Sequence, residues 1–305
     1  MVIYACKRLI EAIPTLIFVL FLTFTLLRFA PGSPFDSDRV FPPQIQQNLN
    51  AKYGLDQPLL RQFGIWISDT LHGDLHESFQ YLDEPVSRII AQALPISLLM
   101  GTISLLLSVL TGIGLGAMAA QNPGGILDSS ILLLTITWIS LPSYLVASLL
   151  ILVFSLSLAW LPPALLEDPS SWILPVLTLS TRPVALIARL TRSSVLEALQ
   201  SDYIRTALAK GLSRRQVLLR HALANSLIPV VTLLGPLTAN LITGSFVVEI
   251  VFQIPGLGKH FVSSVLNRDY PLVMGITLIY GIILIGCNLL VDLAYAWLDP
   301  RIRLT

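Results

Sequence analysis

Long stretches without any charged residue constrain this chain more than any other feature of its sequence. No charge occurs between Arg88 and Asp128, and residues 130–160 are uncharged as well. A helix needs about 20 mostly apolar residues to cross the hydrocarbon core of a bilayer, and both stretches exceed that length. Only 12% of the residues are charged, about half the share of a soluble domain, so we expect a polytopic membrane protein.

Six stretches meet or approach the required length, which predicts an all-α fold with six transmembrane helices. The first could instead be a secretory signal peptide, because Lys7 and Arg8 precede its apolar run. That run is long for a signal peptide and no clear cleavage site follows it, so we interpret it as a retained anchor. The predicted helices cover approximately residues 9–29, 94–120, 130–160, 172–190, 227–250 and 272–298.

The fourth predicted helix carries Thr181-Arg182-Pro183 near its middle. An arginine at this depth is costly, and a proline leaves one backbone carbonyl without its helical hydrogen bond. We therefore expect either an interruption of the helix or an Arg182 side chain that faces a wet cavity. Two roles stay open for Arg182: an interior side chain paired with a carboxylate or carbonyl, and a contact to substrate.

The distribution of basic residues predicts the orientation. Six crossings place both termini on one face, together with the loop 191–226, and Lys and Arg near the helix ends are more numerous on that face. Positive charge marks the cytoplasm, so both termini and this loop are predicted to be cytoplasmic. The chain then divides into residues 1–93, an anchor helix with an extracytoplasmic segment that contains a short helix at 59–71, and a five-helix core at 94–305.

The sequence lacks the motifs of hydrolytic enzymes. G-x-x-x-x-G-K-[ST], H-E-x-x-H and G-x-S-x-G are all absent. His72 and His76 lie in a polar segment and are interpreted as solvated side chains rather than metal ligands. Gly112 and Gly116 are four residues apart inside an uncharged span, which favours helix packing over a dinucleotide site. We expect no enzyme activity, metal or cofactor in this chain, and its net charge of +1 suggests no nucleic-acid partner.

The loop 191–226 is predicted to begin with a short amphipathic helix. Asp202 suits a helix start, and Ile204, Ala207 and Leu208 form an apolar stripe at helical spacing. Gly211 fits the left-handed position that ends a helix. The helix is therefore expected to cover about residues 202–210.

A second, basic helix is expected to follow, because Ser213 and Gln216 form a capping box. The whole segment could be a solvated loop, a DNA-binding helix-turn-helix or a docking site for a cytoplasmic protein. The apolar stripe argues against the first interpretation, and membrane tethers on both sides argue against the second. We therefore interpret residues 202–211 as a docking helix that lays its stripe into a groove of a partner.

The segment Arg205-Thr-Ala-Leu-Ala-Lys-Gly211 resembles the cytoplasmic E-A-A-x-x-x-G loop of the permease subunits of bacterial ABC importers. Ala207 and Gly211 match the strict pattern, whereas Arg205 and Thr206 depart from it in a form typical of the peptide-importer branch. Other segments resemble the first permease of oligopeptide importers: Pro31-Gly-Ser-Pro-Phe35, Pro42-Pro43, Ala51-Lys-Tyr-Gly-Leu55, Gly73-Asp74, Ile242-Thr-Gly-Ser245, Glu249, Pro255-Gly-Leu-Gly258, Leu266-Asn-Arg-Asp-Tyr270 and Asp299-Pro-Arg-Ile-Arg303.

This resemblance implies a type I ABC importer permease fold in the bacterial inner membrane and half of a transmembrane pathway for oligopeptides. It implies as partners a second homologous permease, two cytoplasmic ATPase subunits that hold ATP and magnesium, and an extracytoplasmic peptide-binding protein. It also implies that a set of residues contacts an ATPase subunit: Asp202, Tyr203, Ile204, Arg205, Thr206, Ala207, Leu208, Lys210 and Gly211.

Several residues are candidates for the substrate path or a gate. Glu249 lies near the outer end of the fifth span, where it could contact substrate or pair with the loop 253–260. The segment from Pro255 through Gly256 to Gly258 could form a gate or a plain turn. Together with Arg182, these residues form the predicted path.

Asn288 and Asp292 are four residues apart on the sixth span, so they share a helix face. We interpret them as polar contacts between helices rather than as pore residues. Asp292 can also pair with an arginine near the cytoplasmic surface.

Other transport functions remain open. Within the family these are import of dipeptides, nickel or antimicrobial peptides. A different class, the ion-coupled secondary transporter, usually shows broken spans and paired carboxylates near mid-membrane. A membrane-embedded enzyme is disfavoured by the missing catalytic motifs.

Overall fold

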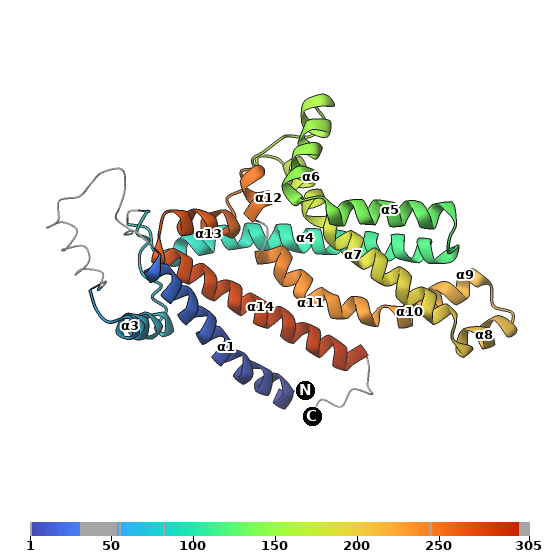
Figure 1. The fold of residues 1–305 in the computed structure, drawn as a ribbon, viewed down its shortest axis with the longest axis horizontal. Helices are drawn as coiled ribbons and strands as arrows, with labels where there is room; N and C mark the ends of the chain where they lie inside the picture. Colours follow the sequence, from blue (N-terminus) through green and yellow to red (C-terminus); the bar gives the residue numbers. More distant parts are fainter. Residues whose placement is uncertain (1, 31–53, 55, 82, 244–245, 299–305) are drawn as a thin grey trace.

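The computed structural model describes residues 2–30, 54, 56–81, 83–243 and 246–298, and its regular secondary structure is helical (Figure 1). Over these residues, strand pairing is limited to one isolated bridge between Glu77 and Pro85. The predicted all-α class is therefore confirmed. Several segments that carry the resemblance lie outside the described residues: 31–35, 42–43, most of 51–55, 244–245 and 299–303.

Long helices alternate with short ones along the chain, and the label η marks 3-10 and π-helical turns. In chain order the elements are α1 (Val2–Phe29), α3 (Leu59–Leu71), α4 (Val86–Gln121), α5 (Ile126–Ser140), α6 (Ser143–Leu150), η1 (Ile151–Ser157), η2 (Pro169–Trp172), α7 (Ile173–Leu199), α8 (Asp202–Ala209), α9 (Arg214–Val217), η3 (Leu218–Ala222), α10 (Leu223–Ser226), α11 (Ile228–Thr243), α12 (Phe246–Val251), α13 (Leu257–Leu266) and α14 (Tyr270–Leu298).

Five of these segments are long and apolar enough to cross a membrane, and a sixth is present if a bent pair of helices is counted as one span. The five are α1, α4, α7, the segment of α11 and α12, and α14, which agree with five of the predicted spans. α4 begins earlier than predicted, at Val86, and α7 continues to Leu199. Arg192 therefore lies on a long helix rather than in the predicted loop 191–226.

The third predicted span, residues 130–160, is not one helix. α5 ends at Ser140, and the helical segment Ser143–Ser157 continues at an angle of 109° to it (Figure 1). Pro142 causes this break, because proline lacks an amide hydrogen and its ring disfavours the helical conformation of the preceding residue. Leu141 accordingly has an extended backbone, with φ −80° and ψ 128°. The structure corrects the prediction of a straight span.

α7 passes without interruption through Arg182 and Pro183, so the expected break in the fourth span is wrong. Neighbouring helices and hydroxyl groups compensate for a proline inside a membrane helix. Here α4 packs along α7 and supports it around Pro183. The other alternative was an Arg182 side chain that faces a cavity, and it does not require a break in the helix.

Two glycines allow α4 and α7 to approach closely. A Cβ atom at Gly112 would lie 2.8 Å from the Ile187 side chain. A Cβ atom at Gly116 would lie 2.5 Å from the carbonyl oxygen of Ala188 and 2.6 Å from the Cβ of Thr191. The two glycines thus stand at the contact between these helices, where any larger residue would push them apart.

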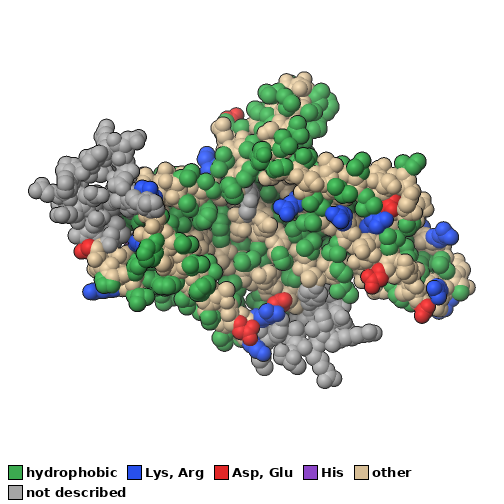
Figure 2. Space-filling view, viewed as in Figure 1, with side chains coloured by type: hydrophobic (Ala, Val, Ile, Leu, Met, Phe, Trp, Pro, Cys, Tyr) green, Lys and Arg blue, Asp and Glu red, His purple; other side chains and the backbone are tan. Residues whose placement is uncertain are grey.

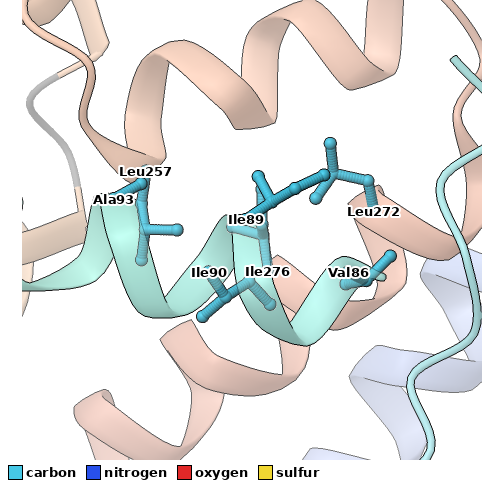
Figure 3. Packing of buried hydrophobic residues seen from close by; sticks show 7 residues of the cluster. All are labelled: Val86, Ile89, Ile90, Ala93, Leu257, Leu272 and Ile276. Atoms are coloured by element: carbon cyan, nitrogen blue, oxygen red, sulfur yellow. The ribbon is translucent and has the colours of Figure 1, made fainter. Parts of the chain in front are cut away.

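One end of the molecule is closed by a cluster of buried side chains from α4, α13 and α14. Figure 3 shows the first turns of α4 between the two other helices. The cluster comprises Val86, Ile89, Ile90, Ala93, Leu257, Leu272 and Ile276. This end also carries α3, and the predicted short helix at 59–71 is confirmed by its bounds. Phe63 and Trp66 of α3 pack against Phe24 of α1.

α1 and α14 run side by side, and their described ends at Val2 and Leu298 lie near each other (Figure 1). The opposite ends of these two helices lie beside α3 and α13. At the far side of the molecule, α8 and α9 follow the end of α7. The helices therefore separate an end built around α3 from an end built around α8.

Candidate functional site

α8 is a short helix at one end of the molecule, between the long helix α7 and the segment α9 to α10 (Figure 1). Gly211 ends it with φ +86°, a left-handed conformation that favours glycine. The Ser213 hydroxyl accepts from the backbone N–H of Gln216, and the Gln216 side chain accepts from the backbone N–H of Ser213. The predicted stop and the capping box of the next helix are both confirmed.

Two of the three residues of the apolar stripe of α8 pack on their own chain. Ile204 and Ala207 are buried in a cluster with Ala120, Val195, Val217, Leu218 and Ala222. Leu208, the third residue of the stripe, is 43% exposed, so the expectation that the stripe enters a groove of a partner is corrected for Ile204 and Ala207 only. The exposed side of α8 is the surface available for docking, and it is formed by Asp202, Tyr203, Arg205, Thr206, Leu208 and Lys210.

A buried ion pair connects α7 to the start of α5, close to this cluster. The carboxylate of Asp128 accepts from Nε of Arg192 at 2.5 Å and from Nη2 at 2.7 Å. The backbone N–H of Gly124 donates to the same carboxylate at 2.8 Å. Asp128 is only 2% exposed, so the pair is a fixed internal connection. No local sequence pattern predicts this pair, because Asp128 and Arg192 are far apart in the sequence and are brought together by folding.

Glu249 is buried at the other side of the helix bundle. Its carboxylate accepts from the Ser97 hydroxyl at 2.9 Å and from the backbone N–H of Lys259 at 2.8 Å. The Ser97 hydroxyl in turn accepts from the backbone N–H of Leu257 at 2.9 Å. Of the two roles left open for Glu249, the structure shows pairing with the loop 253–260, since this side chain has no exposed surface for a substrate.

The loop that carries Pro255 is fitted closely around this carboxylate. A Cβ atom at Gly256 would lie 2.5 Å from the carboxyl carbon of Glu249, and one at Gly258 would lie 2.8 Å from the Cα of Phe246. Both glycines are therefore required by close packing. A role as a gate stays a prediction for these residues.

Arg182 lines a cavity of about 410 Å³ between α5, α7, α11 and α12. Its side chain is exposed, and within the described residues it forms neither an ion pair nor a hydrogen bond. Polar side chains share this cavity with it: Ser140, Ser143, Thr178, Thr181 and Asn240. Of the two roles left open for Arg182, interior pairing within the chain is not what the structure shows.

Asn288 and Asp292 share one face of α14 but contact different helices. Asp292 pairs with Nε of Arg8 on α1 at 3.3 Å. The side-chain oxygen of Asn288 lies close to Gly235 on α11, where a Cβ atom would stand 3.3 Å from it. Both residues thus lie between helices, as their spacing suggested.

A second cavity, of about 670 Å³, lies between α1, α3 and the start of α14. The Arg28 guanidinium stands between the rings of Phe24 and Tyr270, 4.5 Å and 4.4 Å from their centroids, and its Nε donates to Gln62 at 2.9 Å. Among the described residues, the cation is therefore held by two aromatic faces and one amide.

The loop before α4 is tied to the start of α14 through Asp269. This buried carboxylate accepts hydrogen bonds from the Ser78 hydroxyl and from the backbone N–H of Phe79. Burial raises the pKa of Asp269, and these hydrogen bonds lower it in part. The tie thus connects the segment after α3 to the helix bundle.

His72 and His76, which lie four residues apart in the sequence, form local contacts. His72 Nδ1 lies 2.7 Å from the Ser68 carbonyl, and His76 Nε2 lies 3.4 Å from the Asp69 carboxylate. Across the described part of the chain, no group of His, Cys, Asp and Glu side chains could hold a metal ion.

Comparison with known proteins gives matches over the whole chain. The family described as binding-protein-dependent transport system inner membrane component matches residues 112–304. The oligopeptide transport system permease protein OppB of Haemophilus influenzae is 42% identical over 299 residues, which cover 97% of this chain and 98% of the relative. The dipeptide transport system permease protein DppB of Bacillus subtilis is 42% identical over 301 residues, which cover 99% and 98%.

Two solved structures share the fold at low identity. The MetNI methionine ABC transporter in an inward-facing conformation superposes with a TM-score of 0.59 at 18% identity, over 72% of this chain and 100% of the matched chain. An amino acid ABC transporter with histidines superposes with a TM-score of 0.54 at 16% identity, over 69% and 94%. Structural similarity at such low sequence identity supports the arrangement of the helices and gives no information about the substrate.

Proposed function

The chain belongs to the family of binding-protein-dependent transport system inner membrane components, and from this membership we propose that it is a permease subunit of an ATP-driven importer of short peptides. The observation that carries the proposal is the similarity, over nearly the full length, to permeases of both oligopeptide and dipeptide transport systems. Because relatives for both substrates are about equally similar, peptides as a class are supported better than one length of peptide.

The energy source is assigned to other subunits. The sequence has no phosphate loop, and members of the family are transport subunits rather than hydrolases. We infer two cytoplasmic ATPase subunits, a second permease and an extracytoplasmic peptide-binding protein as partners. ATP then biases the transporter by binding one conformation of the assembly more tightly than the other.

The exposed side of α8 is the proposed docking surface for an ATPase subunit. Tyr203 and Leu208 are 41% and 43% exposed there, so they offer apolar contact area beside the charged Lys210. The opposite side is held by Ile204 and Ala207 in the buried cluster. A force on α8 is therefore passed into the body of the chain instead of bending a loose loop.

Two contacts carry this movement onward. The buried cluster joins α8 to the last turns of α7, which runs through the whole bundle and packs along α4. The pair of Arg192 with Asp128 joins the same part of α7 to α5. We propose that α8, α7 and α5 move as one rigid body, and that this movement opens the transport pathway to one side of the membrane or to the other.

The end that carries α3 is proposed to face outward. With α8 on the cytoplasmic side, α3 and the segment up to Pro85 lie on the opposite side, where a peptide-binding protein would dock. The anchor and the outer segment then extend to Pro85, and the permease core begins with α4 at Val86 rather than at residue 94.

Uptake in cells tests the proposal. A strain that lacks this chain but keeps its partners should fail to accumulate labelled trialanine, and the restored chain should recover uptake. Nickel uptake and free alanine uptake serve as controls and should not change. Recovery of nickel uptake alone would overturn the assignment to peptides.

A further inference from the structure

From Arg182 onward, the exposed positions of α7 are polar or charged. From residue 180 to residue 198 its exposed residues are Arg182, Arg189, Ser193 and Glu197. Spacings of seven and four residues place them on one side of a helix. The exposed strip of α7 is therefore polar from Arg182 to Glu197, whereas the first turns of the helix expose Ile173 and Leu177.

Other spans expose a different kind of surface. α4 exposes Leu99, Leu106 and Leu110, and α14 exposes Ile282 and Leu290. Such leucine and isoleucine surfaces suit contact with lipid, whereas an arginine near the centre of a bilayer is costly. The strip on α7 is therefore expected to face water or another subunit rather than lipid.

Arg182 and Arg189 have no internal partner that would neutralise them. Neither forms an ion pair or a hydrogen bond within the described residues, while Arg192 on the same helix is held by Asp128. Arg182 lies about 13 Å along the helix from its start at Ile173, and Arg189 lies about 10 Å further on. Two unpaired cations thus succeed each other along the direction of the span.

The surroundings of Arg182 suit an anion. Its cavity of about 410 Å³ is lined mostly by apolar residues, together with the hydroxyls of Ser140 and Ser143 and the Asn240 amide, and none of the described residues that line it is acidic. Figure 2 shows basic side chains over the stretch where α7 passes beside α5, among hydrophobic and other side chains. A guanidinium with neutral donors around it binds a carboxylate through two parallel hydrogen bonds.

We propose that Arg182 and Arg189 bind the carboxylate of a passing peptide in succession, first in the cavity and then further along α7. This inference rests on the proposed function, and it adds which end of the substrate the pathway recognises. The rival explanation is that both arginines pair with acidic residues of the second permease.

Thiol labelling in the assembled transporter separates these explanations. Ser140 lines the cavity of Arg182, and Ser193 lies one turn from Arg189, so Ser140→Cys and Ser193→Cys place probes beside each cation. The chain first receives Cys6→Ala and Cys287→Ala. The measurements are the labelling rates with an anionic sulfonatoethyl and a cationic trimethylammonioethyl methanethiosulfonate, in the nucleotide-free and ATP-bound states.

Both probes should be labelled in at least one state, with a preference for the anionic reagent. Arg182→Gln should lower that preference about 10-fold at position 140, Arg182→Lys should retain most of it, and Arg61→Gln on α3 should leave it unchanged. Trialanine should slow labelling at both positions, and trialanine amide should slow it about 10-fold less effectively, the factor that one charge-assisted hydrogen bond supplies.

Two results would overturn the proposal. The first is an absence of labelling in both states, which indicates lipid or a sealed contact between subunits. The second is equal protection by trialanine and its amide, which indicates that no carboxylate is recognised. Uptake of trialanine by the same cysteine variants is measured in parallel, so a failure of peptide transport itself is recognised separately.

Discussion

The ion pair between Asp128 and Arg192 offers a quantitative test of how α5 and α7 are held together. Removal of one partner from a buried pair costs about 3–5 kcal/mol, because the other charge is left without compensation. Asp128 is 2% exposed and would keep only the Gly124 N–H, so Arg192→Met should cost about 3–5 kcal/mol. The Arg192 side chain is 23% exposed and can reach water, so Asp128→Asn should cost less, about 1–3 kcal/mol.

The double variant decides whether the two residues act as a pair. With both charges removed, no uncompensated charge remains, so the double variant should be more stable than Arg192→Met alone. The two substitutions should therefore be non-additive by about 2 kcal/mol or more. The free energy of unfolding can be measured by titration with dodecyl sulfate in mixed micelles, followed by the fluorescence of the five tryptophans.

The exposed pair of Arg88 with Glu84 provides a matched control. Its side chains are 59% and 41% exposed and 3.6 Å apart, so Arg88→Met should cost less than about 1 kcal/mol. Costs below about 1 kcal/mol for both Asp128→Asn and Arg192→Met, or additive costs in the double variant, would refute the reasoning about a buried connection.

Three further predictions follow from single positions. Gly116→Ala should destabilise the chain by about 1–3 kcal/mol in the same unfolding titration, because the added Cβ would lie 2.5 Å from a backbone oxygen. Gly114→Ala is the control, since a Cβ at Gly114 would meet nothing within 4 Å, and it should be neutral or stabilising. Equal effects of the two substitutions would contradict the role of Gly116 in helix packing. Gly211→Val, at φ +86°, should lower the amount of peptide imported per ATP hydrolysed. Gly73→Val has similar backbone strain, at φ +88°, but lies near the end of the molecule that carries α3, so it should leave this ratio unchanged. An unchanged ratio in Gly211→Val would contradict coupling through α8. Burial and, secondly, an adjacent lysine lower the pKa of His260, so its contribution to stability is present above about pH 6.5 and lost as the pH falls through the pKa of the folded state. The melting temperature should therefore fall between pH 7.5 and pH 5.5 by more in the wild type than in His260→Gln, and parallel curves would contradict this.

Local chemistry made part of this fold predictable. The stop at Gly211 and the capping box of Ser213 with Gln216 depend on residues that are neighbours in the sequence, and the structure has both. The bounds of α3 and the presence of five of the spans, though not the ends of α4 and α7, also follow from local patterns of apolar residues. Such features are encoded within one or two turns of chain, where periodicity and caps are sufficient.

Two prolines show what such patterns miss. The run 130–160 was interpreted as one span because it lacks charge, although Pro142 breaks it. A break at Pro183 was one of two alternatives for the fourth span, and α7 is continuous there. The two prolines differ in their surroundings rather than in their chemistry: α7 is packed along α4 on both sides of Pro183. Tertiary contacts decide such cases, and they are not visible in the pattern of a single segment.

The direction of the α8 stripe and the pair of Asp128 with Arg192 were missed for a related reason. The spacing of apolar residues indicates that one side of α8 is covered, but it does not indicate whether a partner or the same chain covers it. Ile204 could therefore have faced either one. The carboxylate and the guanidinium come from distant segments that only the fold brings together. Sites that depend on long-range contacts therefore needed the structure.

The central claim is that this chain guides peptides while its partners supply the energy. The most direct test reconstitutes it in lipid vesicles, once with all partners and once alone, and measures accumulation of labelled trialanine against its gradient. Accumulation should require the complete assembly, ATP and intact phosphate loops in the ATPase subunits, and it should be unaffected by collapse of the proton gradient. Accumulation by the chain alone, driven by a proton gradient without ATP, would contradict the account.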